Sequence, residues 1–496
     1  MMPRLRLSRD AALPGLLALG LGALMSLALA PTHYIWAVPI ALGGIGALVL
    51  RATSPWRGAL IGWGFGLGYF VLGLAWIIEP FLVDPERHAW MAPFALLFLA
   101  AGLALFWAAA FSGAVRFARG GPRLLLLTGL LSLAEFARAY VLTGFPWAAF
   151  GQFWIDTPAA QLLPWIGPHG LSVLTLAAFL PLAFVRERLA IAVLPGAMLA
   201  ALVTLWPTPP APETTDHTVR LVQPNAPQHK KWHPDFRWDF VRRAMAFNAE
   251  GPRPDMIIWP ETSVPQLLND AQGTLEAVHQ AAPGVPLLLG IQREEGGAYY
   301  NSAAYLGSEG TVQALYDKAH LVPFGEYIPF GDVMARFGIH GFASQAGAGY
   351  AAGPGARLLD LPVGAALPLI CYEAVFPQDV RAAPARPDVL VQITNDAWFG
   401  TRSGPYQHLV QARMRAAEQG LPMLRAANTG VSGLIDPYGR LGPSLPLGEA
   451  GHVDVVLPRA LPATLYSRTG DWPVLALSLL LAGFGFLRGT NSSLRS

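Results

Sequence analysis

Cysteine is almost absent from the chain: Cys371 is the only one among 496 residues. A single thiol excludes an internal disulfide and any zinc or iron–sulfur site built from cysteines. Because a chain without internal disulfides suits either redox compartment, the cysteine count does not place the protein. A lone buried cysteine is most often an inert small hydrophobic residue, so a chemical role for Cys371 has to be argued from the rest of the chain.

Charge is also scarce. Charged residues make up 13% of the chain and hydrophobic residues 53%, and the mean hydropathy is +0.39. Soluble domains carry roughly a quarter charged residues, so a large part of this chain must face something other than water. The net charge of +2 gives no support to a nucleic-acid partner.

Long apolar runs predict a membrane domain at residues 1–206 and a last span with a cytoplasmic tail at 463–496. Eight runs approach the length needed to cross a bilayer: 12–30, 34–50, 58–78, 89–114, 124–142, 161–185, 189–206 and 472–487. We interpret the first run as a retained helix, because another apolar run follows almost at once and no clear cleavage site precedes a soluble region.

Arginines orient these spans. They gather before the first run, in alternate short loops and after the last run: Arg4, Arg6, Arg9, Arg51, Arg57, Arg116, Arg119, Arg123, Arg186, Arg188, Arg488 and Arg495. By the positive-inside rule both termini are cytoplasmic, and the long polar stretch before the last span lies outside the cytoplasm. Glu135 and Arg138, inside the fifth run, either neutralise each other as an i,i+3 pair or form the polar wall of a cavity.

The polar stretch predicts an α/β domain. Residues 207–217 form a Pro-rich linker, and the domain covers 218–462. Short β-rich runs alternate there with helix-like segments, a pattern typical of α/β folds. The strand-like runs are 218–223, 255–261, 285–292, 301–307, 311–318, 366–373, 388–396, 423–430 and 452–457, and the helix-like segments are 235–249, 272–282 and 406–419.

Three polar residues, Glu261, Lys318 and Cys371, end apolar strand-like runs. Side chains that follow strands of an α/β sheet gather at one edge, where ligands bind. Alone, an acid or lysine after a strand is usually a solvated loop residue, but together the three supply a base, a cation and a nucleophile for acyl transfer. Glu261 can take the thiol proton, and Lys318 with the backbone N–H of Tyr372 can stabilise an oxyanion.

The sequence gives little support for a histidine-activated nucleophile or for a metal site. His320 and His408 sit in no recognisable Cys–His motif, and His229 and His233 lack the acidic partner of a metalloprotease helix. We therefore predict no metal site and no cofactor.

Five motifs around these residues occur in the order found in the nitrilase superfamily: "WPETSVP" (259–265), "YDKAHLVPFGEYIP" (316–329), "ICYEAVFP" (370–377), "NDAWFG" (395–400) and "RAANTG" (425–430). The domain resembles that superfamily, whose members use a Glu-Lys-Cys triad on an α-β-β-α sandwich. Placed between seven predicted spans and one more, it resembles the bacterial apolipoprotein N-acyltransferase family. "LVQPNAPQHKKW" (221–232), "GFPW" (144–147) and "LYSRTGDWP" (465–473) fit that family too.

The resemblance implies a two-step acyl transfer at the outer leaflet of the bacterial inner membrane. Cys371 would attack the sn-1 ester of a phospholipid, typically phosphatidylethanolamine, and form an acyl thioester. The α-amine of the N-terminal diacylglyceryl-cysteine of an apolipoprotein would then take the acyl chain, with Glu261 as general base. The resemblance also implies a periplasmic catalytic domain and a monomer.

The same resemblance points to three residues near the triad. Glu326 matches the second acid of nitrilase sites, although a loop carboxylate is the simpler interpretation. Tyr372 and Glu373 follow the nucleophile directly and match positions important in the family.

Four further residues have weaker assignments. Trp232 resembles a tryptophan near the substrate entrance, or is simply packed. Trp398 and Phe399 belong to a mobile lid, or dip into lipid. Asn301 orients the site, or is an ordinary residue at the start of a strand.

Two alternative functions stay open. A membrane-tethered amidase would use the same triad with water as the acceptor. A transporter or receptor could carry a catalytically inactive nitrilase-like domain, although no internal repeat or paired broken helix supports it.

Overall fold

A computed structural model describes residues 9–329 and 349–493, without the side chains of 9–12 and 491–493. Arg4, Arg6 and Arg495, used above to orient the spans, lie outside these residues. The described chain forms two compact units. One comprises the residues up to Ile78, Arg87–Thr208 and the residues from Arg468 onward; the other comprises Glu79–Glu86 and Pro209–Ser467.

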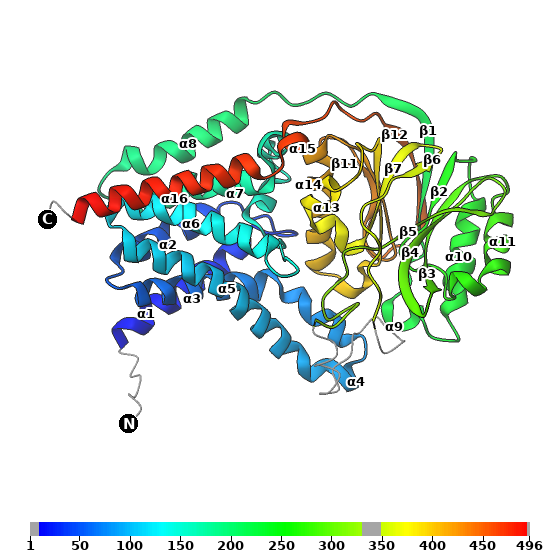
Figure 1. Cartoon of the computed structure of the whole chain (residues 1–496), viewed down its shortest axis with the longest axis horizontal. Helices are drawn as coiled ribbons and strands as arrows, with labels where there is room; N and C mark the ends of the chain where they lie inside the picture. Colours follow the sequence, from blue (N-terminus) through cyan, green and yellow to red (C-terminus); the bar gives the residue numbers. More distant parts are fainter. Residues whose placement is uncertain (1–8, 330–348, 494–496) are drawn as a thin grey trace. The chain divides into compact units, whose positions relative to one another are not determined.

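The first unit is helical, and each of the eight predicted apolar runs overlaps one of its longer α-helices (Figure 1). These helices are α1 (Arg9–Ser26), α2 (Ala37–Arg51), α3 (Pro55–Gly73), α5 (Ala92–Phe117), α6 (Gly120–Tyr140), α7 (Leu163–Phe179), α8 (Leu189–Leu205) and α16 (Trp472–Ser493).

By length and composition, three helical stretches of the described chain could each cross a membrane: Pro85–Phe117, Pro158–Phe184 and Trp472–Thr490. A fourth is added if Pro55–Gly73 and Ala75–Leu82, bent by 46°, form one span. Leu13–Ser26, Ala37–Arg51 and Leu189–Leu205 are shorter apolar helices. The number of eight spans therefore stays a prediction.

Glycines let α3 approach its neighbours closely. A Cβ at Gly68 would lie 2.0 Å from the carbonyl oxygen of Leu19 on α1, and one at Gly66 would lie 2.9 Å from Ala104 on α5. Small residues at helix crossings allow this kind of backbone contact, which drives helix association in lipid.

Glu135 and Arg138 form a buried ion pair, with 2.6 Å between Arg138 Nη2 and Glu135 Oε2. Trp107 Nε1 donates to Glu135 Oε1 at 2.8 Å, and Arg138 Nη1 donates to the Trp147 carbonyl at 2.6 Å. The self-neutralising interpretation is confirmed, because the two charges satisfy each other and their remaining bonds stay within the helical unit.

The second unit contains two six-stranded sheets with the orders β12-β1-β2-β3-β4-β5 and β11-β10-β9-β8-β7-β6. Strands β1, β2 and β3 of the first sheet run parallel to one another, as do β7, β8 and β9 of the second. All other neighbouring strands in the two sheets are antiparallel. The strands are β1 (Thr214–Gln223), β2 (Met256–Ile258), β3 (Leu287–Glu295), β4 (Ala298–Leu306), β5 (Val312–Asp317), β6 (Leu359–Leu361), β7 (Gly364–Ile370), β8 (Val389–Thr394), β9 (Met423–Ala427), β10 (Ser432–Ile435), β11 (Leu441–Leu445) and β12 (Gly451–Pro458).

The structure corrects the predicted strands in two respects. β1 starts at Thr214, inside the predicted linker, because Thr214 pairs with Pro458 across β12. β6, β10 and β11 lie outside the predicted runs. β6 and β10 are only three and four residues long, and β11 is an edge strand with four exposed residues, so none shows a clear alternation.

Helices cover the outer face of both sheets (Figure 1). α10 (Arg237–Ala249) and α11 (Gln272–Gln280) pack on the first sheet, and α13 (Pro377–Arg381) and α14 (Gly404–Gln419) on the second. The unit is therefore the α-β-β-α sandwich that the resemblance implies.

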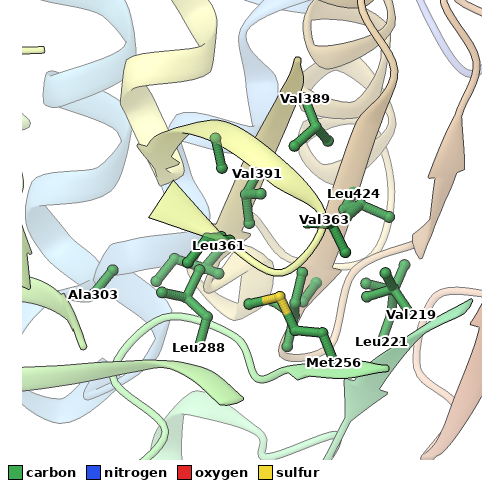
Figure 2. Packing of buried hydrophobic residues seen from close by; sticks show 14 of the residues in the cluster. Val219, Leu221, Met256, Leu288, Ala303, Leu361, Val363, Val389, Val391 and Leu424 are labelled. Atoms are coloured by element: carbon green, nitrogen blue, oxygen red, sulfur yellow. The ribbon is translucent and has the colours of Figure 1, made fainter. Parts of the chain in front are cut away.

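The main core lies between the two sheets, as Figure 2 shows. Strand β8 illustrates the alternation: Val389, Val391 and Ile393 face the other sheet, and Leu390 packs with the helix-side cluster. On the same helix side, Gln392 and Thr394 are fully buried polar residues.

We expect Val391→Ala to destabilise this unit by about 1.5–3 kcal/mol, because Val391 is fully buried between the sheets. Val456→Ala removes the same atoms from a side chain that is 47% exposed and should cost less than about 0.5 kcal/mol. Thermal unfolding of the detergent-purified chain measures both. Equal losses would contradict the assigned core.

Candidate active site

The strand ends bring Glu261, Lys318 and Cys371 together in the second unit. Lys318 and Cys371 directly follow β5 and β7, and Glu261 follows β2 by three residues. Lys318 Nζ lies 3.8 Å from Glu261 Oε1, and the Cys371 thiol interacts electrostatically with both. All three side chains are buried. The base, cation and nucleophile singled out in the sequence thus share one buried site.

Hydrogen bonds fix the Glu261 carboxylate. Asn301 Nδ2 donates to its Oε1 at 2.6 Å, and the backbone N–H of Asn395 donates to its Oε2 at 2.8 Å. Asn301 also donates to Glu326 Oε1 at 3.1 Å. Asn301 therefore lies between the two acids and orients both.

Glu326 is the closer carboxylate to Lys318, with 2.8 Å between Lys318 Nζ and Glu326 Oε2. Burial disfavours the charged ammonium, but Glu326 and Glu261 outweigh burial and raise the pKa of Lys318. Lys318 is therefore a permanent cation and hydrogen-bond donor, as oxyanion stabilisation requires.

Cys371 begins a short 3-10 helix, η7 (Cys371–Val375), with a φ of +53°. This left-handed conformation is unfavourable for a residue with a side chain, and such strain often marks functional sites. Burial raises the pKa of the thiol, and Glu261 raises it further, while Lys318 and a hydrogen bond with Thr394 oppose them. The resting group is a thiol, so attack requires that a base remove its proton.

Two family models match the sequence of this chain. A carbon-nitrogen hydrolase model matches residues 218–462, and a model of the apolipoprotein N-acyltransferase N-terminal domain matches residues 21–206. The chain is 38% identical to a protein from Bradyrhizobium diazoefficiens named apolipoprotein N-acyltransferase, over 94% of this chain and 94% of the relative. It is also 38% identical to a protein of the same name from Rhodopseudomonas palustris, over 95% of this chain and 94% of the relative.

The chain belongs to the apolipoprotein N-acyltransferase family. It is therefore an acyltransferase with a nitrilase-like domain. Among solved structures, an amidase from Nesterenkonia sp. is similar over 50% of this chain and 92% of that chain, with 21% identity and a TM-score of 0.37.

In this member of the apolipoprotein N-acyltransferase family, Glu373 joins the two segments that carry Lys318 and Cys371. Its carboxylate accepts hydrogen bonds from the Ile370 N–H at 2.7 Å, the Ala319 N–H at 2.8 Å and the Tyr316 hydroxyl at 2.8 Å. Burial raises the pKa of Glu373 to about 7, although these bonds favour its charged form.

Among the described residues, no hydrogen bond joins the four aromatic side chains predicted near the site to Glu261, Lys318 or Cys371. The Tyr372 ring is buried against His320 and Phe376, and Trp232 is half-buried at the edge of a small cavity. Trp398 and Phe399 belong to η8 (Asp396–Phe399) and are half-buried, and the Phe399 ring packs on His408.

Lys231 also lies at the site, although the sequence did not predict it, and it ends the short helix α9 (Gln228–Lys231). Its buried Nζ donates to the Glu261 carbonyl and to Thr262 Oγ1, both at 3.0 Å. Burial lowers the pKa of Lys231 to about 8, although Glu261 and Cys371 favour its charged form. In the sequence "QHKKW", two adjacent lysines are typical of a solvated surface, so no signal there separates Lys231 from Lys230.

His408 is a second residue near the site that the sequence does not reveal, because no motif links it to Cys371. In the structure His408 Nε2 lies 3.1 Å from the carbonyl oxygen of Cys371. The connection is spatial: α14 packs over the end of β7, and sequence spacing does not reveal it.

We expect Glu373 to make stability fall as pH rises from 4.5, its ordinary pKa, to about 7. Across this window the folded chain holds a proton that the unfolded chain has lost, so the free energy of unfolding decreases as the pH rises. At about 1.4 kcal/mol per pKa unit, the contribution approaches about 3 kcal/mol.

The measurement is the unfolding temperature between pH 4.5 and 7.5, in the wild type and in Glu373→Gln. The variant should show a smaller decrease across this window, since glutamine does not titrate. Identical pH profiles in the two proteins would contradict the assignment.

Proposed function

We propose that the protein transfers an acyl chain from a glycerophospholipid, phosphatidylethanolamine, to the α-amine of the N-terminal diacylglyceryl-cysteine of apolipoproteins. Membership of the family supports this reaction. The observation that carries it is the buried cluster in which Lys318 lies between Glu261 and Glu326 beside the strained Cys371.

In the first half-reaction Glu261 takes the thiol proton while Cys371 Sγ bonds to the carbonyl carbon of the sn-1 ester. The carbonyl oxygen becomes an oxyanion, which Lys318 and the backbone N–H of Tyr372 stabilise. The ester C–O bond then breaks, and Glu261 returns its proton to the departing alkoxide. The products are a lysophospholipid and an acyl thioester on Cys371.

In the second half-reaction the neutral α-amine of the apolipoprotein attacks the thioester carbonyl, and Glu261 takes a proton from the amine. The same donors stabilise the second oxyanion. The C–S bond breaks, and the proton on Glu261 passes to the departing thiolate. The result is an amide on a triacylated lipoprotein and a free Cys371 thiol.

Some of the supporting residues hold the triad in position, and the others control how substrates reach it. Asn301 and Glu326 hold Glu261 and Lys318 in place, and Glu373 holds the Lys318 and Cys371 segments together. We assign Trp232 to the substrate entrance, and Trp398 with Phe399 to a lid over the site.

The proposed location is the bacterial inner membrane. The arginine distribution supports eight spans, both termini in the cytoplasm and a nitrilase-like domain on the periplasmic side. There the site meets the outer leaflet, which supplies the phospholipid donor. The proposed enzyme acts as a monomer.

Incubation of the purified enzyme with phosphatidylethanolamine and no acceptor should add one acyl mass to Cys371, as measured by intact-protein mass spectrometry. The adduct should be labile to neutral hydroxylamine, absent in Cys371→Ala, and cleared when a diacylated lipopeptide is added. Slow clearance with no acyl group on the peptide would favour the amidase alternative. The absence of any adduct in folded protein would contradict the thioester mechanism.

Lys318→Met should lower the rate of thioester formation by about 10²–10³, since it removes an oxyanion donor. The control is Lys230→Met, which makes the same change at an exposed position on α9 and should leave the rate unchanged. Single-turnover acylation per mole of folded enzyme measures both. An unaltered rate in Lys318→Met would remove Lys318 from the mechanism.

A further inference from the structure

The carbonyl group of the nucleophile is held from the helix side of the sheet. Its oxygen lies 3.1 Å from His408 Nε2, on α14, and accepts from Gln392 Nε2, on β8, at 3.2 Å. Both side chains are fully buried. We call this pair the carbonyl clamp. The proposed reaction uses the Cys371 thiol and assigns no role to the clamp.

A buried ion pair fixes the orientation of the clamp. Arg425, the register partner of Gln392 on β9, donates to Gln392 Oε1 and, at 2.6 Å, to Asp396 Oδ2. Asp396 Oδ1 lies 2.9 Å from His408 Nδ1. Because Arg425 occupies the amide oxygen of Gln392, its NH2 group faces the Cys371 carbonyl.

Asp396 faces His408 as a charged carboxylate. Burial opposes its ionisation, but Arg425 and His408 outweigh burial and lower the pKa of Asp396 to about 2. The carboxylate keeps a proton on His408 Nδ1. If Nε2 is also protonated, it donates to the Cys371 carbonyl. If it is not, it accepts from Gln392 Nε2 at 3.1 Å, while the second N–H of Gln392 donates to the carbonyl. Both states hold the oxygen.

The geometry of the peptide bond carries this restraint to the reacting side. In a planar trans peptide the C=O and N–H groups point in opposite directions. The carbonyl of Cys371 and the N–H of Tyr372 belong to one such plane. Fixing the oxygen toward α14 therefore fixes the N–H on the opposite side. Because Tyr372 lies in the first turn of η7, its N–H precedes the first intrahelical bond.

We infer that His408 and Gln392 are positioning residues that hold the Cys371–Tyr372 peptide so that its N–H faces the developing oxyanion. The inference rests on the proposed function, in which this N–H is an oxyanion donor. The inference also explains how the strained φ of Cys371 is maintained. The buried hydrogen bonds to the carbonyl stabilise a backbone conformation that is unfavourable by itself.

The test compares two reactions of the same thiol in the full-length enzyme. Acylation by phosphatidylethanolamine needs the oxyanion donors, whereas alkylation by iodoacetamide forms no oxyanion and reports only thiolate formation and access. His408→Leu should lower the acylation rate roughly tenfold to a hundredfold. This decrease is no larger than the one expected when an oxyanion donor is removed completely. It should change the alkylation rate by less than about threefold, because Glu261 still activates the thiol.

Three further variants sharpen the result. His408→Gln retains a terminal N–H that can reach the carbonyl and should recover part of the acylation rate. Gln392→Met removes the second donor and repeats the test if His408→Leu does not fold. Ser432→Ala is the control, because it removes a buried hydroxyl bonded to Gln223 and Ala427 but not to the Cys371 peptide. It should lower stability and leave both rates per folded molecule unchanged.

The outcomes separate this inference from the proposed function. A selective loss of acylation, partly restored in His408→Gln, supports the clamp. An unchanged acylation rate, or an equal loss of both reactions, overturns it, since the latter shows a general collapse of the site. If the wild type is alkylated normally but never acylated, the proposed function fails first, and the inference falls with it.

Discussion

The proposed active site depends on burying a lysine where only carboxylates can keep it charged. Lys318 is almost completely inaccessible, and an unpaired ammonium there would be strongly disfavoured. Glu326 at 2.8 Å and Glu261 at 3.8 Å reverse this penalty. Lys318 and Glu326 lie in the segment after β5, and Glu261 lies in the loop after β2. The sheet must therefore bring these two strand ends together before the cation is tolerated. The fold and the charged cluster therefore require each other.

A second buried ion pair, between Arg425 and Asp396, holds the residues that bind the carbonyl of Cys371, the proposed nucleophile. Arg425 and Asp396 are both fully buried, and isolated pairs of this kind seldom add much stability. Here their value is directional, because each holds one member of the carbonyl clamp. Polar groups on the helix side of β8 and β9 would be anomalous in a purely structural core. They are understandable in a domain that has to hold one peptide plane in a strained conformation.

The sequence allowed prediction of the residues that end strands, but not of those that act through packing. Glu261, Lys318 and Cys371 each follow an apolar run, and strand-end geometry is general enough to expect them at one edge. His408 and Lys231 follow no such rule. His408 reaches Cys371 only because α14 packs across the sheet, and Lys231 is buried although its neighbour Lys230 is exposed. Short strands such as β6 escaped prediction because three residues show no reliable period.

The two buried lysines show that neighbouring groups can shift the pKa of the same kind of side chain in opposite directions. Lys318 has carboxylates within reach and a raised pKa, whereas Lys231 binds a carbonyl and a hydroxyl, and its pKa falls to about 8. In the proposed reaction the proton moves from the thiol to Glu261, and the negative charge moves from Glu261 to the sulfur and then to the oxyanion. The net charge of the site is the same at every step. A buried site can therefore carry the reaction without solvating a new charge, provided that the donors already face the place where the charge arrives.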